Sequence, residues 1–581
     1  MEIQDLVNSM NGKLIGNDDF FSIDGFTGRF TFLHEAHTGD IVIREWIDAT
    51  GVQMAFNQNI ACLITPDAKP GACEAANRLN FPLIVIEDMQ LAKNFVSHYL
   101  RNKEIDDIYD ITEYVEGKLV GNDDFFSIDG FTGKFTFLNE AHTGDIVIRH
   151  WIDATGIEMA FNKNIACLIT QTPKDGAVEE AERLNFPLII TDKIELANAM
   201  ALSQTIFKYC PASTNVVITG TNGKSTTSHL IYHILKNAGH HVLTNTDSES
   251  EFNTLIDPMV SKLICDEVEK NGELDYLVIE ISEVQGWLGN LMEHHAAIMS
   301  KAIGPHVGVI TNIAMDHIGL VNSIDDVYDE IKRVPESIGD GITVLNYDDE
   351  LVRELEAQNP FYTSMSKLEG DNAVCFDDDA IVYNNRLILT IDELPFNSNH
   401  FIQNILSAIG ACISLGIEID DIVDGVKTYK SLNRRFTKLN DEPLIYDDFA
   451  HNPDGIKATI AETLKMLPEN QKLHVACAIR GSRGVEINQL NVDALVESMN
   501  DDIILYLSSS KDVVNELNFV EDEEREVFFN TLNENNIDYI HFDNLADCLK
   551  EVCQKADKND IILLIGAQGM DPAESLLSDI I

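Results

Sequence analysis

The chain has 581 residues, of which 45% are hydrophobic, and its 96 acidic residues against 41 lysines and arginines give a formal net charge of −55 at pH 7. This length exceeds what one hydrophobic core can organise, so we expect three or four domains. A chain this acidic repels nucleic acids and anionic membranes, and we expect neither as a partner.

Hydropathy and cysteine usage both point to an intracellular protein. No run of 18 apolar residues occurs, and the start at Met1–Asp5 lacks the basic and then apolar pattern of a secretory signal. The 10 cysteines are scattered without a CxxC pair, which is typical of a reducing compartment and argues against zinc and disulfides. We therefore expect a cytoplasmic protein.

A tandem repeat fills the first third of the chain. Residues 12–65 recur without a gap as residues 117–170, and 47 of the 54 positions are identical. A repeat of this length is a whole small domain, since solenoid repeats have periods of roughly 20 to 50 residues. We predict an α/β unit that runs strand, strand, helix, strand, helix, strand. In the first copy these include strands at 41–43, 60–65 and 82–86, and helices at 47–57 and 72–79. Recent duplication does not require that both copies bind a ligand, and one copy could be a spacer.

The most informative motif is a glycine-flanked turn between an apolar strand at 215–219 and a helix predicted at 227–237. This order surrounds a polyphosphate with backbone N–H groups, with Lys224 on the β and γ oxygens and the Ser225 hydroxyl on Mg²⁺. The alternative is a glycine-rich turn with a chance Lys-Ser. We predict an ATP site made of Gly220, Thr221, Asn222, Gly223, Lys224, Ser225 and Thr226.

Two later strands end in polar residues that can bind a metal ion. The strand at 275–282 carries Glu280 near its carboxyl end, where ligands bind in open α/β sheets, and this makes Glu280 the leading Mg²⁺ ligand. A solvated glutamate at a strand end is the alternative. The strand at 307–312 leads to Asp316 and His317, and His317 is a candidate ligand for a second Mg²⁺, although a lone Asp-His is more often a turn.

The ordered set of motifs from Asn215 to the end resembles the Mur ligase family, whose members form amide bonds with ATP through an acyl phosphate. The loop Gly-Thr-Asn-Gly-Lys-Ser-Thr matches the phosphate loop of that family. Its first glycine lies three residues before Gly223, whereas the common Walker spacing puts it five residues before. The segment from Glu280 reads Glu-Ile-Ser-Glu, where the family has Glu-Val-Ser-Ser-His. The missing histidine leaves the roles of Glu283 and Gln285 open.

The resemblance also implies a modified lysine. Fifteen residues after His317 comes Lys332, on a predicted helix with an apolar face of Ile324, Val327, Ile331 and Val334. Family members have at this distance a lysine that reacts with CO₂ to give a carbamate ligand for the second metal, whereas an ordinary helical lysine would be a solvated charge. The implied catalytic set is Lys224, Glu280, His317 and Lys332, and the implied Mg²⁺ ligands are Ser225, Glu280, His317 and Lys332.

Further motifs resemble the nucleotide clamp of the family. His400 to Asn404 resembles His-Asn-x-x-Asn, in which Asn404 would contact adenine, but Phe401 replaces the first Asn. The segments at 433–436 and 445–453 resemble Gly-Arg-Phe/Met and Asp-Asp-Tyr-Ala-His-x-Pro. The implied contacts to ATP are Asn312, Asn404, Arg435, Asp448 at the ribose or phosphates, and His451 near the γ-phosphate.

The last 140 or so residues alternate strands and helices, with strands expected at 474–478, 503–508, 539–542 and 561–565, as in a second nucleotide-binding type of sheet. Two of its loops resemble family turns near the incoming amino acid, and arginines there would hold a carboxylate or phosphate. Ser508 to Lys511 stands where diaminopimelate-adding enzymes carry Asp-Asn-Pro-Arg, so a different mode of amino-acid binding is expected. The implied amino-acid residues are Arg480, Arg483, Gly566 and Gln568.

The resemblance implies a multidomain α/β architecture. We expect a duplicated small α/β module at 1–107 and 108–212, a central phosphate-loop ATPase domain with a mainly parallel sheet at 213–436, and a Rossmann-like domain at 437–581. In the second copy, 143–148 and 154–169 resemble the amino-terminal domain of E-type Mur ligases, which holds the UDP part of the substrate.

The implied activity is ATP-dependent addition of a free amino acid to a UDP-linked peptide precursor of a cell-wall polymer. The doubled module and the altered segment after Glu280 are more similar to archaeal pseudomurein peptide ligases than to bacterial murein enzymes. We expect a monomer or a weak oligomer. The alternatives are an amide ligase of the folylpolyglutamate or cyanophycin kind and, from another class, a phosphate-loop ATPase that needs no carboxylate acceptor. A purely structural protein would give Lys224, Glu280 and His317 no reason to converge.

Overall fold

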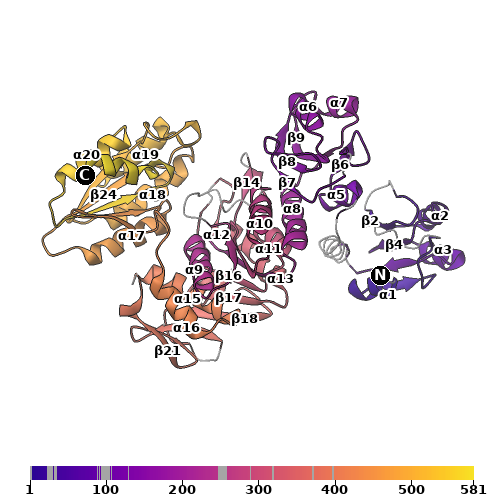
Figure 1. Cartoon of the computed structure of the whole chain (residues 1–581), viewed down its shortest axis with the longest axis horizontal. Helices are drawn as coiled ribbons and strands as arrows, with labels where there is room; N and C mark the ends of the chain where they lie inside the picture. Colours follow the sequence, from indigo (N-terminus) through magenta and orange to yellow (C-terminus); the bar gives the residue numbers. More distant parts are fainter. Residues whose placement is uncertain are drawn as a thin grey trace. The chain divides into compact units, whose positions relative to one another are not determined.

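The computed structural model describes residues 3–22, 30–31, 36–87, 89, 92, 105, 107–127, 130–246, 258–287, 290–316, 319–368, 372–395 and 398–581. The chain forms two compact units (Figure 1). The first contains Met1–Ser213 and Ile256–Leu274, and the second contains Thr214–Leu255 and Asp275–Ile581. A short piece of the central sequence therefore belongs to the amino-terminal unit.

The two copies of the repeat contain sheets with the same strand order. This order is β1-β5-β4-β3-β2 in the first copy and β6-β10-β9-β8-β7 in the second. In each sheet the first strand is antiparallel to its neighbour and the other pairs are parallel. Strand β4 is buried along its whole length, which explains its continuous apolar sequence. The strands are β1 (Lys13–Ile15), β2 (Phe30–Thr31), β3 (Ile41–Ile43), β4 (Cys62–Thr65), β5 (Leu83–Val85), β6 (Lys118–Val120), β7 (Phe135–Thr136), β8 (Ile146–Ile152), β9 (Cys167–Pro173) and β10 (Leu188–Ile190).

The helices of the two copies also correspond, and each copy begins with a helix that we did not expect from the sequence. Asp48 and Asp153 cap the next helix by accepting hydrogen bonds of 2.8 Å from the Gly51 and Gly156 amides. The first of these helices therefore begins at Ala49 and not at residue 47. The helices are α1 (Ile3–Ser9), α2 (Ala49–Asn57), α3 (Ala72–Leu79), α5 (Ile108–Tyr114), α6 (Ala154–Asn162) and α7 (Ala177–Leu184).

Helix α8 (Ile194–Tyr209) ends the second copy and packs against α10 (Pro258–Asn271), which comes from the central sequence. Helix α10 also contacts β7 at the edge of the sheet, and Lys134 lies 2.7 Å from Glu269 of α10. The hydrogen bond to Glu269 raises the pKa of Lys134. The edge of the second sheet is thus covered by a helix that the repeat itself does not encode.

The second unit begins with a nine-stranded sheet in the order β12-β13-β11-β16-β17-β18-β19-β20-β21. Its strands are parallel up to β19, and β20 and β21 continue it as antiparallel strands. Helices α9 (Lys224–Asn237) and α15 (Asn399–Ser414) pack against each other and against the sheet. The strands are β11 (Thr214–Thr219), β12 (Val242–Thr244), β13 (Tyr276–Glu280), β16 (Val307–Ile310), β17 (Ile342–Asn346), β18 (Asn359–Ser364), β19 (Ala373–Asp377), β20 (Ala380–Tyr383) and β21 (Arg386–Thr390).

Besides the four-residue helix α14 (Glu350–Arg353), four further helices and a small hairpin complete this part of the second unit. Helix α16 packs on α9, while α11 contacts α12 and α13 and also lies against β11. The hairpin of β14 (Gly286–Trp287) and β15 (Asn290–Leu291) follows β13. The helices are α11 (His295–Ile303), α12 (Ile324–Ile331), α13 (Val334–Ile338) and α16 (Ile419–Thr428).

The carboxy-terminal part is a six-stranded sheet in the order β22-β23-β27-β24-β25-β26. Only the pairing of β22 with β23 is antiparallel in this described sheet, and helices cover two hydrophobic clusters on it. The four strands expected from the sequence are present, which confirms the Rossmann-like prediction. The elements are β22 (Thr437–Asp441), β23 (Leu444–Asp448), β24 (Leu473–Ala478), β25 (Ile503–Ser508), β26 (Tyr539–Phe542), β27 (Ile561–Ile565), α17 (Pro453–Met466), α18 (Val485–Ser498), α19 (Asp522–Glu534), α20 (Leu545–Lys555) and α21 (Ala573–Ile580).

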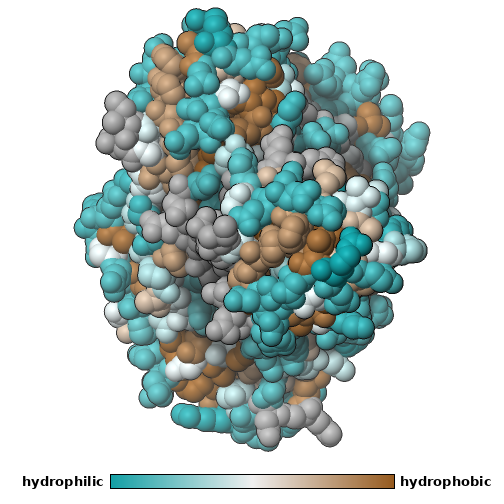
Figure 2. All heavy atoms as spheres, turned by 90° about the vertical axis from the view of Figure 1, so that its right-hand side faces the viewer, coloured by the Kyte–Doolittle hydropathy of each residue, from teal (hydrophilic) through white to brown (hydrophobic). Residues whose placement is uncertain are grey.

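The described surface is in keeping with the acidic composition. The face in Figure 2 is largely hydrophilic, and its hydrophobic residues gather in several small patches. Across the described ranges, no helix combines the length and the apolar character needed to cross a membrane.

The paired cores of the repeat allow a matched stability test. Phe81 and Phe186 occupy corresponding positions, both are fully buried, and each meets a neighbouring phenylalanine ring edge to face, at 5.2 and 5.5 Å. We expect Phe81→Ala and Phe186→Ala each to destabilise its own copy by about 3–5 kcal/mol, because each leaves a cavity. Hydrogen exchange of peptides from α3–β5 and α7–β10, whose sequences differ, measures the two copies separately. Equal loss of protection in both copies from one substitution would contradict independent cores.

Candidate active site

The turn between β11 and α9 has the geometry of an anion-binding loop. Gly220 has φ 120° and Gly223 has φ 82°, in the region that favours glycine. A Cβ at Gly223 would lie 2.2 Å from Asn404 Oδ1, and one at Gly220 would lie 2.3 Å from Thr311 Oγ1. Helix α9 begins at Lys224, three residues earlier than expected, because Gly223 is its amino-terminal cap. The first-turn amides of α9 therefore remain available to an anion.

The loop is held in place from behind by the end of β16. Asn312 accepts a hydrogen bond from the Asn222 amide and donates one to the Asn222 carbonyl, both of 2.8 Å. Thr311 Oγ1 donates to the same carbonyl at 2.7 Å, and the Thr221 hydroxyl exchanges hydrogen bonds with the backbone of Ala314. Asn312, which the resemblance placed at the nucleotide, thus contacts the loop backbone.

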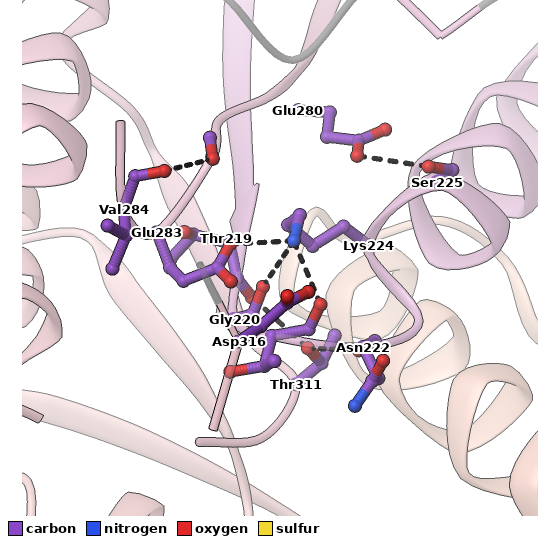
Figure 3. A network of polar contacts seen from close by, with 12 residues as sticks. Thr219, Gly220, Asn222, Lys224, Ser225, Glu280, Glu283, Val284, Thr311 and Asp316 are labelled. Carbon is purple, nitrogen blue, oxygen red and sulfur yellow. Dashed lines mark hydrogen bonds and ion pairs between the residues drawn. The ribbon is translucent and has the colours of Figure 1, made fainter. Parts of the chain in front are cut away.

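Lys224 is turned back onto its own loop in this structure (Figure 3). Its Nζ donates to the carbonyl oxygens of Gly220 at 2.7 Å and Thr221 at 2.9 Å, and lies 2.7 Å from Glu283 Oε2. The Lys224 side chain is 12% exposed and that of Glu283 is fully buried. Glu283, whose role the sequence left open, is therefore a direct partner of the phosphate-loop lysine.

Glu280 presents its carboxylate beside the start of α9. Ser225 Oγ donates to Oε1 at 3.0 Å and Thr246 Oγ1 donates to Oε2 at 2.8 Å, while the Asn245 side chain pairs with the backbone of Glu280. Glu280 is 1% exposed. One buried carboxylate with neighbouring hydroxyls is a donor set that Mg²⁺ accepts when phosphate oxygens complete its shell, so these residues fit the expected metal. No motif singled out Thr246, which follows the end of β12.

Of the other two expected metal ligands, Lys332 is the one that the structure describes. His317 lies outside the described residues. Lys332 is the carboxy-terminal cap of α12, is 43% exposed and forms an ion pair with Asp329. The single helix expected here is split, because Pro335 lies in the first turn of a separate helix, α13, that begins at Val334. Of its expected apolar face, Ile324 is 41% exposed and the other three side chains are buried.

A cavity of about 1100 Å³ lies within the second unit at the carboxyl ends of both sheets. It is lined by much of the set expected from the sequence, and by further residues of the segment that joins the sheets. Gly220, Asn312, Lys332, Arg483 and Gly566 are not among its lining residues. The expected residues that line it are Thr221, Asn222, Gly223, Lys224, Ser225, Thr226, Glu280, Asn404, Arg435, Asp448, His451, Arg480 and Gln568.

Two adjacent arginines connect the sheets around this cavity. Arg435 donates to Ser225 Oγ at 3.5 Å, and the Arg434 and Arg435 guanidinium groups each lie 5.1 Å from the ring centroid of Phe449. Arg434 donates to Asp447 at 3.2 Å and to the Ala567 carbonyl at 3.1 Å. Burial raises the pKa of Asp447 to about 6, which the Arg434 charge opposes. Sequence reasoning chose Arg435 and missed Arg434, because nothing local shows which of two adjacent arginines turns toward β27.

His451 is a neutral group in the cavity wall. Its Nδ1 is 3.0 Å from the Phe449 carbonyl oxygen, and its Nε2 is 3.9 Å from Asp316. Burial, helped by the charge of Arg480, lowers the His451 pKa to about 3, so the ring is uncharged at neutral pH. Arg480 also lies 3.9 Å from Asp316. Asp316, from the end of the first sheet, thus faces two residues of the second.

Each of the two loops expected to hold the amino acid brings one of its two expected residues to the cavity. The amides of Ser482, Arg483 and Gly484 donate to the buried carboxylate of Glu524 at 3.0, 2.8 and 2.7 Å. The Arg483 guanidinium donates to the Ser482 carbonyl at 3.1 Å on the surface. The Gly566 carbonyl accepts from Arg434. Arg480 and Gln568 are therefore the two of the four expected residues that reach the cavity.

Comparison with known proteins gives two family matches that cover most of the second unit. The Mur ligase middle domain matches residues 218–412 and the Mur ligase glutamate ligase domain matches residues 434–568. A UDP-N-acetylmuramate–L-alanine ligase of Caldicellulosiruptor bescii is 28% identical over 61% of this chain and 73% of its own. A UDP-N-acetylmuramoylalanine–D-glutamate ligase of the same organism is 29% identical over 47% of this chain and 57% of its own.

Solved structures share the fold. MurF from Acinetobacter baumannii aligns with a TM-score of 0.57 at 17% identity, over 81% of this chain and 97% of that one. A pseudomurein peptide ligase type C from Methanothermus fervidus aligns with a TM-score of 0.50 at 20% identity, over 75% of this chain and 95% of that one. The two family domains lie on the two sheets that form the cavity, and the chain belongs to the Mur ligase family, whose members are ATP-dependent, ADP-forming ligases.

Proposed function

We propose that this protein joins the carboxylate of a UDP-linked peptide precursor of a cell-wall polymer to the amine of a free amino acid, using ATP. The observation that carries the proposal is the shared cavity. Lys224, Ser225 and Glu280 from the first sheet line it together with Arg435, His451 and Arg480 from the segments that lead to and belong to the second. One cavity can therefore hold a nucleotide and a second substrate in reacting distance.

In the proposed nucleotide site, the amides of the loop and Lys224 bind the phosphates and Asn404 contacts adenine. Arg435 meets the nucleotide, Asp448 binds the ribose or the phosphates, and His451 lies near the γ-phosphate. Mg²⁺ would be held by Ser225 and Glu280, with His317 and a carbamylated Lys332 as the proposed further ligands. When bound, Mg²⁺ neutralises charge on the transferred phosphoryl group. The carbamate requires the Lys332 ammonium to lose a proton and leave its ion pair with Asp329 before the amine attacks CO₂.

The proposed reaction has two steps. The substrate carboxylate attacks the γ-phosphorus, and the bond to the bridging oxygen of ADP breaks to give an acyl phosphate. The amine then attacks the acyl carbon, and the C–N bond forms as phosphate leaves. Lys224 and Arg435 are placed to stabilise negative charge in the first step, and Arg480 can hold an anionic group of the second substrate. His451, being neutral, acts as a hydrogen-bonding group and not as a counterion.

The finer assignment is to pseudomurein peptide ligation. It is supported by the doubled amino-terminal module and by the Glu-Ile-Ser-Glu segment, both of which differ from the murein pattern. We propose that 108–212 holds the UDP part, that 1–107 is its duplicate, and that 213–436 and 437–581 are the ATP-binding and amino-acid-binding domains. Fully buried Ser508, Ser509 and Ser510 and the ion pair of Lys511 with Asp543 at 2.8 Å favour an amino acid unlike diaminopimelate.

Phosphate release tests the ligase proposal directly. We expect release from ATP and Mg²⁺ to require both a UDP-linked peptide and an amino acid, and Lys224→Ala to lower kcat by about 10²–10³ because a charge that stabilises the transition state is lost. Lys236→Ala, at the exposed end of the same helix, is the matched control and should leave kcat unchanged.

Different outcomes of that assay separate the alternatives. Turnover with acceptors that lack UDP would favour an amide ligase of the folylpolyglutamate or cyanophycin kind. Phosphate release without any acceptor, still abolished by Lys224→Ala, would favour a phosphate-loop ATPase and contradict the ligase.

A second prediction concerns Glu280. We expect Glu280→Gln to raise the Mg²⁺ concentration needed for half-maximal turnover by at least about tenfold, because a neutral amide replaces the charged ligand. Mn²⁺ binding followed by electron paramagnetic resonance gives a readout independent of activity. Glu350→Gln, an exposed glutamate of the same unit, is the control. Unchanged metal affinity in Glu280→Gln would remove Glu280 from the proposed metal site.

A further inference from the structure

All the hydrogen-bonding capacity of the Lys224 ammonium is used inside the protein. An ammonium has three N–H donors, and Lys224 Nζ has three acceptors within 2.9 Å, namely two loop carbonyls and Glu283. Figure 3 shows Glu283 and the loop carbonyls converging on this nitrogen. A phosphate oxygen can therefore bind Lys224 only by replacing one of these acceptors.

Glu283 is the one charged acceptor of the three, and it is buried. It follows β13 by three residues, and its side chain is fully buried. The turn before it is fixed by a hydrogen bond of 2.6 Å from the Ser282 hydroxyl to the Val284 carbonyl. The carboxylate is thus held at the back of the loop, and exchange with a phosphate must occur by movement of the lysine.

The neighbouring His295 does not offer Glu283 a second full charge. His295, the first residue of α11, is fully buried and lies with Nδ1 at 3.3 Å from the Ser282 carbonyl. Burial lowers the pKa of His295 to about 4, so the ring is neutral. Among the ion pairs of the described residues, Glu283 is paired with Lys224. Separating a buried pair is unfavourable, since it leaves a charge without its counterion.

We propose that Glu283 is a positioning residue that holds Lys224 in the nucleotide-free state and competes with the nucleotide phosphates for it. The inference rests on the proposed nucleotide site and adds to it a built-in competitor. A polyphosphate carries more negative charge than one carboxylate and also binds the amides of the loop, so it displaces Glu283 when it enters. After the nucleotide leaves, Glu283 takes the lysine back. The position is distinctive in the sequence, because the resembling motif has serine where this chain has Glu283.

ADP binding without metal tests the competition. Isothermal titration calorimetry in EDTA measures the Kd for ADP of the full wild-type chain, of Glu283→Gln, of Lys224→Ala and of the double variant. We expect Glu283→Gln to bind ADP about tenfold more tightly, because the phosphates no longer have to displace a charged hydrogen-bond acceptor from Lys224. In the Lys224→Ala background the same substitution should change the Kd less than threefold, since no lysine remains to be released.

The controls separate competition from other effects. Glu330→Gln changes another buried glutamate of the same unit, on α12, and should leave the Kd unchanged. If Glu283→Gln tightens binding equally with and without Lys224, simple repulsion between Glu283 and the phosphates explains the result and the competition is overturned. Unchanged or weaker binding by Glu283→Gln also overturns it.

Two further measurements guard against ambiguity. Glu283→Ser, which carries the residue of the resembling motif, replaces Glu283→Gln if that variant folds poorly. We expect it also to bind ADP more tightly than the wild type. Acylation of Lys224 by an amine-reactive ester, followed by mass spectrometry, should be faster in either variant than in the wild type, and an equal rate contradicts the hold on the lysine. Absence of ADP binding by the wild type would instead overturn the proposed nucleotide site itself.

Discussion

The backbone of residues 220–223, held by Thr311 and Asn312 at the end of β16, is the constraint on which the site depends. Four short hydrogen bonds from these two residues and from Thr221 fix the loop against the neighbouring strand. Because the loop is fixed, α9 begins at Lys224, and its first two side chains then face Glu283 and Glu280. A helix begun one residue later would turn each of these side chains by about 100° around the axis and separate them from their partners.

The second sheet is joined to this loop by residues that each make contacts in two directions. Asn452 caps α17 through Oδ1, which accepts from the Gly455 amide at 2.9 Å, while its Nδ2 donates to Asn222 of the loop at 3.0 Å. Arg434 and Arg435 lie against Phe449 and extend to β27 and to Ser225 respectively. A change at the phosphate loop therefore has a direct route to the start of the second sheet, which is the element that brings the amine in the proposed reaction.

Local patterns in the sequence predicted what is local in the structure. The strand end at Glu280 and the loop at Lys224 were readable, because an apolar run and glycine spacing specify them within a dozen residues. The contacts of Glu283, Thr246 and Arg434 were not readable, since each partner is 13 to 133 residues away or belongs to another strand. Arg483 shows the converse, because Glu524, 41 residues later, takes the loop amides that would have offered an anion site. Lys332 was chosen by its distance from His317. The single helix expected around it is divided in the structure, because Pro335 interrupts it.

The charge of the cavity explains why a divalent cation is expected at this site. Of the described residues that line it, five are lysine or arginine and seven are aspartate or glutamate. Arg434 is engaged by Asp447 and Asp571, so it contributes little field to an incoming anion. The chain as a whole is strongly acidic, so long-range attraction cannot bring a nucleotide to the loop. In the proposed site, nucleotide binding would then depend on short-range donors, namely the α9 amides and a released Lys224, and on charge that arrives with the nucleotide as its metal complex. In the proposed competition, Glu283 holds Lys224 until the phosphates arrive. It thereby controls when the one cationic side chain that the loop itself provides becomes available.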